Sequence, residues 1–207
     1  MPPGIFLIDA IGPFFRGYER RRINWSKIPF THLATEGEAR RLQWEQIRAD
    51  MRRFVREVAT AGYNSVTLDD LAHLAPHPLH EPETAQRIAA FREEFAEIFR
   101  IVREAGLKIY VTSDVLPVTP AIDAAIGNHR ERLEEFYRGL VDDFLRDFPE
   151  VSGLVLRIGE SDGVDVKDPI RTRLHVRSAV ETNRLLRHLL PVFEKHDRTL
   201  ILRTWTV

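Results

Sequence analysis

The sequence contains no cysteine among its 207 residues, and this absence excludes disulfide bonds and thiolate metal sites. No apolar run approaches the roughly 20 residues that a membrane-spanning helix needs. Neither sign of charge dominates, because 30 basic and 31 acidic residues give a formal net charge of −1. A nucleic-acid or membrane partner is therefore not indicated. The sequence also lacks a P-loop, a Gly-x-Ser-x-Gly nucleophile elbow and a His-Glu-x-x-His motif.

What is present is the composition of one soluble, globular domain. Hydrophobic residues make up 43% of the chain and charged residues 29%, which is typical of such domains. A chain of this length can bury a sizeable core. The amino terminus lacks the basic segment and the cleavage site of a signal peptide, and it is predicted to form the first strand. We therefore expect a single domain over residues 1–207, in the cytoplasm, with no cofactor and no resident metal.

Four apolar, β-branched runs end on a carboxylate. The last three of these ends, Asp69, Asp114 and Glu160, are 45 and 46 positions apart, and a fifth run reaches Trp205 after another 45 positions. A strand-plus-helix period of this length is typical of repeated β/α units on a parallel sheet. The five runs are Ile5–Asp9, Ser65–Asp70, Ile109–Asp114, Gly153–Glu160 and Thr199–Trp205.

Apolar residues at helical spacing predict four helices between these strands, over about residues 38–60, 83–104, 130–146 and 176–196. Gly62 and Gly106 each follow an alanine where a helix ends, which is typical of a short loop with glycine at the helix C-cap. Pro191 interrupts the last helix, and we expect a kink there. A long connection, about residues 11–36, follows the first strand instead, and its aromatic content argues against disorder.

Two parallel-sheet folds are compatible with this alternation of strands and helices. An open, doubly wound Rossmann sheet calls for a glycine-rich phosphate loop after the first strand, and residues 10–15 are not one. Helices of about 17 to 22 residues and long strand-to-helix loops favour a barrel. The sequence therefore predicts an α/β fold, a truncated TIM (β/α)8 barrel. It would be the N-terminal portion of the barrel, with four β/α units plus a fifth parallel strand.

Reactive groups in such sheets gather at the C-terminal ends of the strands, and Glu160 is the sharpest candidate there. Glycoside hydrolysis needs two carboxyl groups across the scissile bond, one of them protonated as a general acid. A glutamate enclosed by side chains at a barrel mouth can have its pKa raised for that role. The structural alternative for Glu160 is an ion pair with Arg157 or Arg203.

Other polar residues at the strand ends and in the first loop are candidates for substrate binding. Asp69 and Asp70 are adjacent, so we expect one to point into the barrel mouth and the other to start the loop or cap a turn. Arg157 lies inside a strand, where it is costly unless paired, and its expected partner is Glu160 or Asp114, or an anionic substrate. Aromatic and basic residues in the first loop suit a sugar, or else they pack that loop down. The candidate substrate-binding residues are Asp9, Arg16, Trp25, Lys27, Asp69, Asp70, Asp114, Arg157, Arg203 and Trp205.

Three histidines, His73, His77 and His80, follow the second strand. Aspartate and histidine are ligands that divalent metals accept. However, the proline-rich segment around them is typical of a rigid exposed loop, and their spacing matches no compact metal site. We interpret them as solvated loop histidines.

The spaced strand ends, and above all the segments 153–163 and 200–205, resemble those of (β/α)8-barrel glycoside hydrolases, with α-glucuronidase-like barrels as the nearest likeness. The resemblance covers essentially the whole chain. It implies a carbohydrate substrate and a general acid after the fourth strand, here Glu160. In such families other catalytic carboxylates come from later strands, often the sixth and seventh, which this chain lacks. We therefore expect the isolated chain to be inactive.

Three interpretations remain open on the sequence alone. The first is part of a glycoside hydrolase acting on an oligosaccharide or glycoside. The second is a metal-dependent sugar isomerase or epimerase of barrel fold, which would hold a divalent ion with Asp69, Asp114, Glu160 and His73. The third is a non-catalytic half-barrel whose acids are caps and ion pairs. In each case, we expect the unpaired edges of the first and fifth strands to promote self-association.

Overall fold

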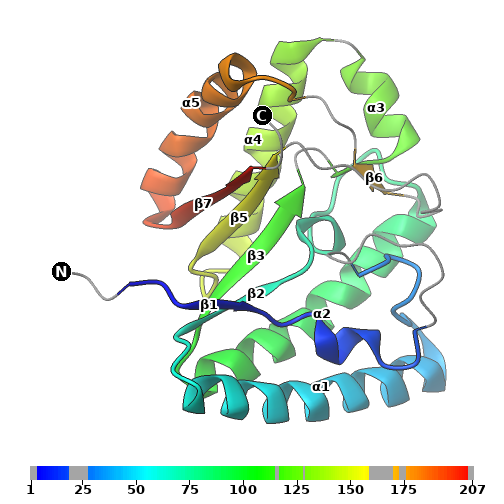
Figure 1. The fold of residues 1–207 in the computed structure, drawn as a ribbon. Helices are drawn as coiled ribbons and strands as arrows, with labels where there is room; N and C mark the ends of the chain where they lie inside the picture. The colour runs from blue at the N-terminus through cyan, green and yellow to red at the C-terminus, as the bar shows by residue number, and fades with distance from the viewer. Residues whose placement is uncertain are drawn as a thin grey trace.

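The computed structural model describes residues 4–18, 28–114, 117–127, 129–158, 170–172 and 176–204. Five parallel strands form one sheet in chain order, curled into half a barrel (Figure 1). Both the parallel direction and the chain order of the strands confirm the sequence prediction. The strands are β1 (Leu7–Asp9), β2 (Ser65–Leu68), β3 (Lys108–Asp114), β5 (Gly153–Ile158) and β7 (Thr199–Thr204).

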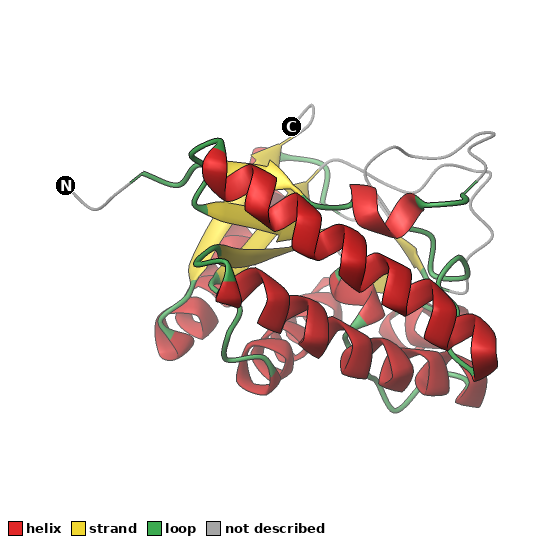
Figure 2. Ribbon diagram, turned by 90° about the horizontal axis from the view of Figure 1, so that it is seen from below, coloured by secondary structure: helices red, strands yellow, loops and turns green. Residues whose placement is uncertain are grey.

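Four long helices connect these strands and lie along one side of the curled sheet (Figure 2). Their bounds agree with the predicted ranges to within three residues. The αβ turns at Gly62 and Gly106 have positive φ angles of 90° and 77°, as the glycine C-cap prediction requires. The helices are α1 (Gly37–Thr60), α2 (Pro82–Glu104), α4 (Arg130–Asp147) and α5 (Ala179–His196).

Short elements that the sequence did not predict occupy the connections after the strands. The 3-10 helix η1 (Gly12–Phe15) follows β1, and η2 (Leu71–His73) follows β2. The helix α3 (Pro120–Ile126) is capped by Thr119, whose side chain accepts a hydrogen bond from the backbone N–H of Ile122. The strands β4 (Pro117–Val118) and β6 (Arg171–Thr172) pair antiparallel in a separate two-stranded sheet.

Alternate residues of each strand face opposite sides of the sheet. One set is apolar and belongs to the hydrophobic core beneath the helices: Val66, Leu68, Ile109, Val111, Leu154, Leu156 and Ile158. The other set is rich in polar side chains, and it faces the inside of the half-barrel: Thr67, Asp69, Tyr110, Thr112, Asp114, Val155 and Arg157. Backbone pairing places Asp114, Arg157 and Arg203 side by side in one row near the C-terminal ends of their strands.

A cluster of aromatic rings fixes the first connection onto the helices. Phe14 of η1 stacks on Phe95 of α2, with 5.4 Å between ring centroids, and meets Trp44 of α1 edge-on. The indole N–H of Trp44 donates a hydrogen bond of 2.8 Å to the carbonyl oxygen of Ala34. Phe14 therefore packs the first connection against α1 and α2. For Phe14, this is the packing role that the sequence left open as the alternative to sugar binding.

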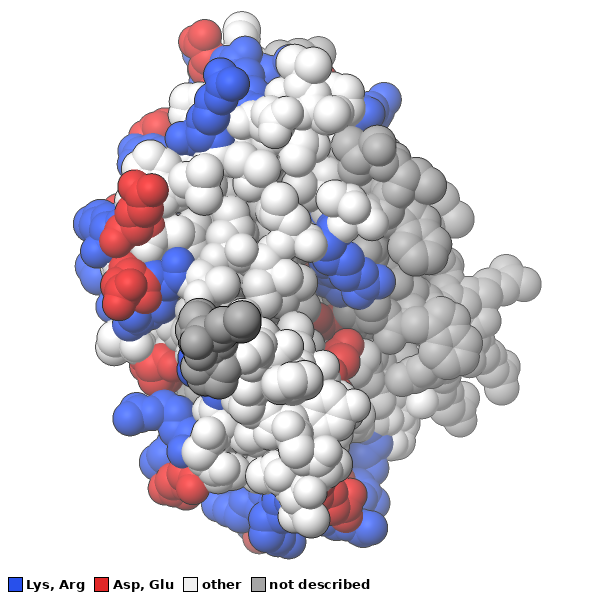
Figure 3. Space-filling model, turned by 60° about the vertical axis from the view of Figure 1, so that its left-hand side comes forward, with Lys and Arg blue, Asp and Glu red and all other residues white. Residues whose placement is uncertain are grey.

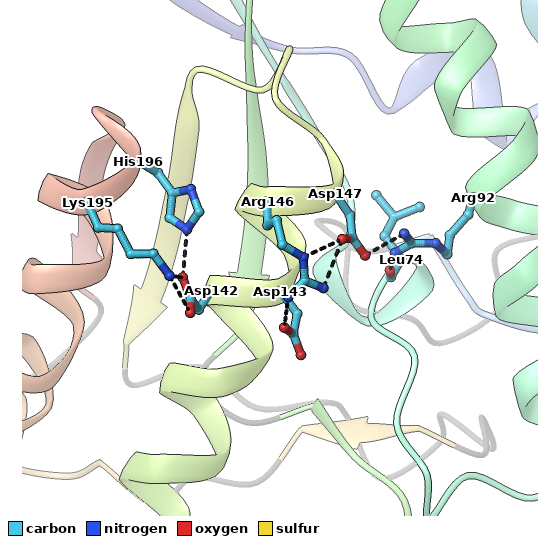
Figure 4. Close-up of polar contacts among 8 residues, drawn as sticks. All are labelled: Leu74, Arg92, Asp142, Asp143, Arg146, Asp147, Lys195 and His196. Carbon is cyan, nitrogen blue, oxygen red and sulfur yellow. Dashed lines mark hydrogen bonds and ion pairs between the residues drawn. The ribbon is translucent and has the colours of Figure 1, made fainter.

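Ion pairs join neighbouring helices at their surfaces. Glu94 of α2 accepts contacts from Arg40 and Arg48 of α1. Between α4 and α5, Asp142 binds both Lys195 and His196, as Figure 4 shows. Such partly exposed pairs contribute little individually, so they fix the orientation of the helices more than they stabilise the fold.

The strands β5 and β7 approach each other closely at Gly153. A Cβ atom at this position would lie 1.9 Å from the carbonyl oxygen of Thr199. Only glycine allows the two backbones to pair at this distance, and the pairing of Gly153 with Thr199 starts the register that places Arg157 opposite Arg203.

Candidate active site

A buried guanidinium surrounded by three carboxylates lies at the C-terminal ends of β2, β3 and β5. Arg157 is 1% exposed, and its Nε atom lies 2.6 Å from an oxygen of Asp114. One of its terminal nitrogens is 3.2 Å from Asp70, and the other is 3.8 Å from Asp69. We call these four residues the Arg157 cluster. Of the two side chains expected to pair with Arg157, Asp114 contacts it, and Glu160 lies outside the described residues.

The structure places both adjacent aspartates against Arg157, although alternation along a strand predicted opposite directions for them. A cis peptide bond joins Asp69 and Asp70. Asp70 has a second role, because its Oδ1 atom accepts a 2.8 Å hydrogen bond from the backbone N–H of Ala72 and caps η2. The predicted turn cap is therefore confirmed for Asp70, and the same side chain also contacts the arginine.

Asp69 is the carboxyl group least compensated by the arginine. Its Oδ1 atom accepts a hydrogen bond from the hydroxyl of Thr112, and its Oδ2 atom has no hydrogen-bond partner among the described residues. Three carboxylates and one guanidinium carry a net charge of −2 when all are ionised, and all four side chains are buried. Burial, aided by the neighbouring charge of Asp70, therefore raises the pKa of Asp69 to about 7 despite the opposing effect of Arg157.

Two more charged residues lie beside the cluster on the inner face. Asp9 ends β1, and its Oδ1 atom accepts a 3.2 Å hydrogen bond from the backbone N–H of Ile11. Asp9 is exposed in part. Partial burial raises the pKa of its carboxyl group, while the positive charges of Arg157 and Arg203 lower it by a smaller amount. Arg203 is exposed on β7, in the same row as Asp114 and Arg157.

The remaining predicted site residues are not brought to the Arg157 cluster by the described structure. Arg16 binds Asp50 of α1 through two hydrogen bonds of 2.7 and 2.8 Å, on the helical side of the molecule. Its guanidinium is mostly exposed, as in an ordinary surface ion pair. The predicted general acid and three predicted sugar contacts lie outside the described residues: Glu160, Trp25, Lys27 and Trp205.

The interpretation of His73 as a solvated loop residue is wrong. His73 is 1% exposed, and its ring packs against those of Phe30, Phe91 and Phe95. The 3-10 helix η2 turns it inward, and the apolar residues that flank it in sequence were the available signal for this burial. His77 and His80 are partly buried, and burial lowers the pKa of His80 to about 4.

The arrangement of the cluster does not favour the interpretation as a metal site. Asp69 and Asp114, two of its proposed ligands, contact the guanidinium of Arg157, which already supplies the neighbouring positive charge. His73 is enclosed by aromatic rings instead. Among the described residues, no group of three or more histidine, aspartate or glutamate side chains has the geometry to hold a metal ion.

Two polar residues that the sequence did not single out support the cluster. Thr112 lies two positions before Asp114 on the same face of β3 and contacts Asp69. On the opposite face, the hydroxyl of Ser113 lies 2.7 Å from that of Tyr137 in α4, and both are buried. This contact fixes α4 against the strand that carries Asp114. Two-residue alternation back from Asp114 is a signal that would have identified Thr112.

Comparisons with known proteins show a likeness of fold to solved structures. No protein-family model and no curated protein matches the chain. Among solved structures, the chain is similar to a GH138 enzyme targeting pectin rhamnogalacturonan II, with a TM-score of 0.52 and 13% identity over 73% of this chain. The chain spans 18% of the length of that enzyme. At this identity the likeness shows the fold, an α/β half-barrel.

A second solved structure is the intracellular xylanase TsXylA from Thermoanaerobacterium saccharolyticum JW/SL-YS485, in complex with xylotriose. It is 13% identical, and the match covers 81% of this chain and 56% of the xylanase. Its TM-score of 0.30 is too low to carry an argument. Both neighbours are glycoside hydrolases.

Within the described residues, no helix is long and apolar enough to span a membrane.

Proposed function

We propose that this chain forms part of a glycoside hydrolase barrel, with its sugar-binding site at the C-terminal ends of β1, β2, β3, β5 and β7. The observation that carries the proposal is the Arg157 cluster. It places three carboxylates and an arginine together at the end of the sheet where barrel enzymes bind their substrates. The fold shared with a GH138 enzyme supports the same class of reaction.

The chemistry of these groups suits a sugar. The carboxylates of the Arg157 cluster are buried, so in this proposal they support the inner face from beneath, and Arg157 holds Asp70 and Asp114 in fixed orientations. Asp9 and Arg203 offer exposed charges on the same inner face. A guanidinium such as that of Arg203 binds carboxylates well, which favours an acidic sugar of the kind that α-glucuronidases cleave.

In this proposal Glu160 is the general acid. It follows the end of β5 by two residues, and β5 carries Arg157. A protonated glutamate would donate its proton to the oxygen of the leaving group, and general acid catalysis contributes roughly 10²–10⁴-fold to the rate. The second catalytic carboxyl group would come from another strand end.

The experiment compares Glu160→Gln with the matched control Glu131→Gln, an exposed position on α4. Hydrolysis is measured in the full-length barrel enzyme that the proposal implies, on unactivated acidic oligosaccharides and on aryl glycosides, whose leaving groups need little protonation. We expect Glu160→Gln to retain the fold and substrate binding and to lose most turnover, with the smallest loss on aryl glycosides. Glu131→Gln should behave as the unmodified chain does.

Calorimetric titration tests sugar binding separately from turnover, in the chain with and without Arg203→Ala. We expect acidic oligosaccharides to bind and Arg203→Ala to weaken them more than it weakens neutral ones. Absence of any sugar binding, together with unfolding of Glu160→Gln, would instead identify the acids as structural caps and ion pairs.

A further inference from the structure

We propose that a cavity between the first two turns of α4 and the first two turns of α5 binds one neutral sugar residue, at a place separate from the Arg157 cluster. The choice of a sugar rests on the proposed function, because a glycoside hydrolase meets its substrate as linked sugar rings. The place of the site and the neutrality of its ligand follow from the residues that line the cavity.

The cavity lies between neighbouring helices, at the end of the sheet where the strands finish. Its walls come from the residues between α3 and α4, from the beginnings of α4 and α5, and from Val176 just before α5. Each long helix runs back along the sheet from the C-terminal end of the strand that precedes it (Figure 1). The cavity and the Arg157 cluster therefore lie at the same end of the molecule, and an extended oligosaccharide approaches both from that end.

The cavity has the size of a single ring. Its volume is about 120 Å³, and an engineered cavity of about 150 Å³ in another protein holds one benzene molecule. The cavity opens to solvent beside His129 and Arg130, which are exposed, so the substituents of a bound ring can protrude. Leu133 and Leu185 supply an apolar part of the lining, and both are buried. Apolar side chains suit the C–H face of a sugar ring, and polar groups in the same lining suit its hydroxyls.

The charged groups of the lining already have partners within the chain. Arg130 of α4 forms an ion pair with Glu181 of α5. Glu134 is 3% exposed, and it contacts the guanidinium of Arg184 at 2.9 Å and the ring of His188 at 3.1 Å. A ligand with a net charge would compete with one of these contacts and leave a partly buried charge uncompensated, which is costly. A neutral ligand avoids this cost.

Hydroxyl groups match the hydrogen-bonding capacity that remains. Glu134 and Glu181 only accept hydrogen bonds, whereas Arg130 only donates them, and a sugar hydroxyl can do both. The carboxylate of Glu181 also accepts a 2.8 Å hydrogen bond from the backbone N–H of Arg177, which fixes its direction before a ligand binds.

The surrounding surface does not select a charged ligand either. On the face that Figure 3 shows, the positive and negative side chains of the described residues are intermingled, and neither sign forms a continuous field. A large field of one sign is what would concentrate ions of the opposite sign near a cleft.

Proton–nitrogen correlation NMR of the 207-residue chain tests the proposal, because it reports each backbone amide separately. The neutral probes are glucose, galactose, xylose and rhamnose, and the acidic probe is glucuronate. We expect at least one neutral sugar to shift the amide signals of Gly127, Leu133 and Leu185, with a dissociation constant on the order of 1 mM for a single ring. Glucuronate should bind there about tenfold more weakly, because its charge competes with an existing ion pair.

Two variants examine the cavity by different means. Leu133→Phe places a ring inside it and should weaken neutral sugars at least about tenfold. Glu181→Gln releases Arg130 from its ion pair, so it should reverse the preference and make glucuronate the tighter ligand. The matched control is Glu135→Gln, because Glu135 pairs with Arg138 on the exposed surface of α4. It should change neither affinity. Circular dichroism verifies that each variant is folded, and Glu181→Gln keeps the test decisive if Leu133→Phe does not fold.

The possible results separate this inference from the proposed function. Shifts confined to amides at the strand ends, such as those of Asp114 and Arg157, would overturn the cavity site and leave the proposed function standing. Absence of shifts with every sugar, at concentrations about a hundredfold above the expected dissociation constant, would also overturn the cavity site, while the turnover of Glu160→Gln decides the proposed function. Glucuronate binding more tightly than the neutral sugars in the unmodified chain would overturn the neutrality of the ligand.

Discussion

Asp69 is expected to make the protein less stable at neutral and alkaline pH than it would be with a neutral side chain at this position. Its pKa is raised from 3.8 to about 7 in the folded protein, chiefly by burial. Between these two pH values, the folded state binds a proton that the unfolded state has released. The stability of the protein therefore falls as the pH rises through this range, and the full penalty is present above about pH 7.

The perturbation that tests this is Asp69→Asn, which keeps the shape of the side chain and removes its titration. A shift of about three units at 1.36 kcal/mol each corresponds to a penalty on the order of 4 kcal/mol for the ionised carboxylate. We expect Asp69→Asn to match the unmodified chain near pH 4 and to be more stable by up to about this amount near pH 8. The difference should develop mostly between those values.

The assay is urea unfolding followed by far-ultraviolet circular dichroism, at intervals between about pH 4 and about pH 8. Asp114→Asn is the control, because Asp114 makes the shortest contact with Arg157, at 2.6 Å, while Asp69 and Asp70 remain beside the guanidinium. It should cost about 1.5–3 kcal/mol near pH 8, the range for a lost hydrogen bond to a charged group. The reasoning is refuted if Asp69→Asn is destabilised near pH 8 as Asp114→Asn is, or if it retains the pH dependence of the unmodified chain.

Two further substitutions probe features that position the Arg157 cluster, and a third probes the surface ion pair of Arg16. Gly153→Ala should cost about 2 kcal/mol or more in urea unfolding, because the new Cβ atom would meet the carbonyl oxygen of Thr199 at 1.9 Å; an unchanged midpoint would contradict this close approach. Tyr137→Phe should cost about 1 kcal/mol in thermal or urea unfolding, since it removes one buried hydrogen bond to Ser113. Arg16→Ala should change stability by less than about 1 kcal/mol, because its ion pair is exposed. Arg16→Ala should also leave sugar affinity unchanged in calorimetry. A clear loss of affinity would instead support the sequence prediction that Arg16 binds the substrate.

The fold was largely predictable because its signals are local and repeated. In each β/α unit, an apolar, β-branched run predicts the strand. A glycine predicts the turn from helix to strand, as at Gly62 and Gly106. The helix α3 was missed because it is only seven residues long and lies between Pro117 and Gly127, in a segment that has the composition of a loop. Its stability depends on the cap at Thr119, which is a single-residue signal.

The site was predictable only in part. An arginine inside an apolar strand requires a compensating charge, which led to Glu160 or Asp114 as the expected partner of Arg157, and the structure shows the contact with Asp114. Alternation along the strand could not indicate that Asp69 and Asp70 would both reach the same guanidinium, because their directions are set beyond the end of β2. His73 was misplaced because neighbouring prolines and histidines outweighed the leucines and alanines beside it.

The register of β5 also determines where the chain tolerates changes in length. Arg157 reaches its carboxylates because it lies an even number of residues after Gly153, whose pairing with Thr199 fixes the start of the strand. Deletion of Val155 alone would turn Arg157 toward α4 and its buried Tyr137, and it would carry a positive charge into the apolar layer. The long connection after β1 has no such parity to preserve. Insertions and deletions should therefore be found between the elements, while the central strands keep a fixed number of residues.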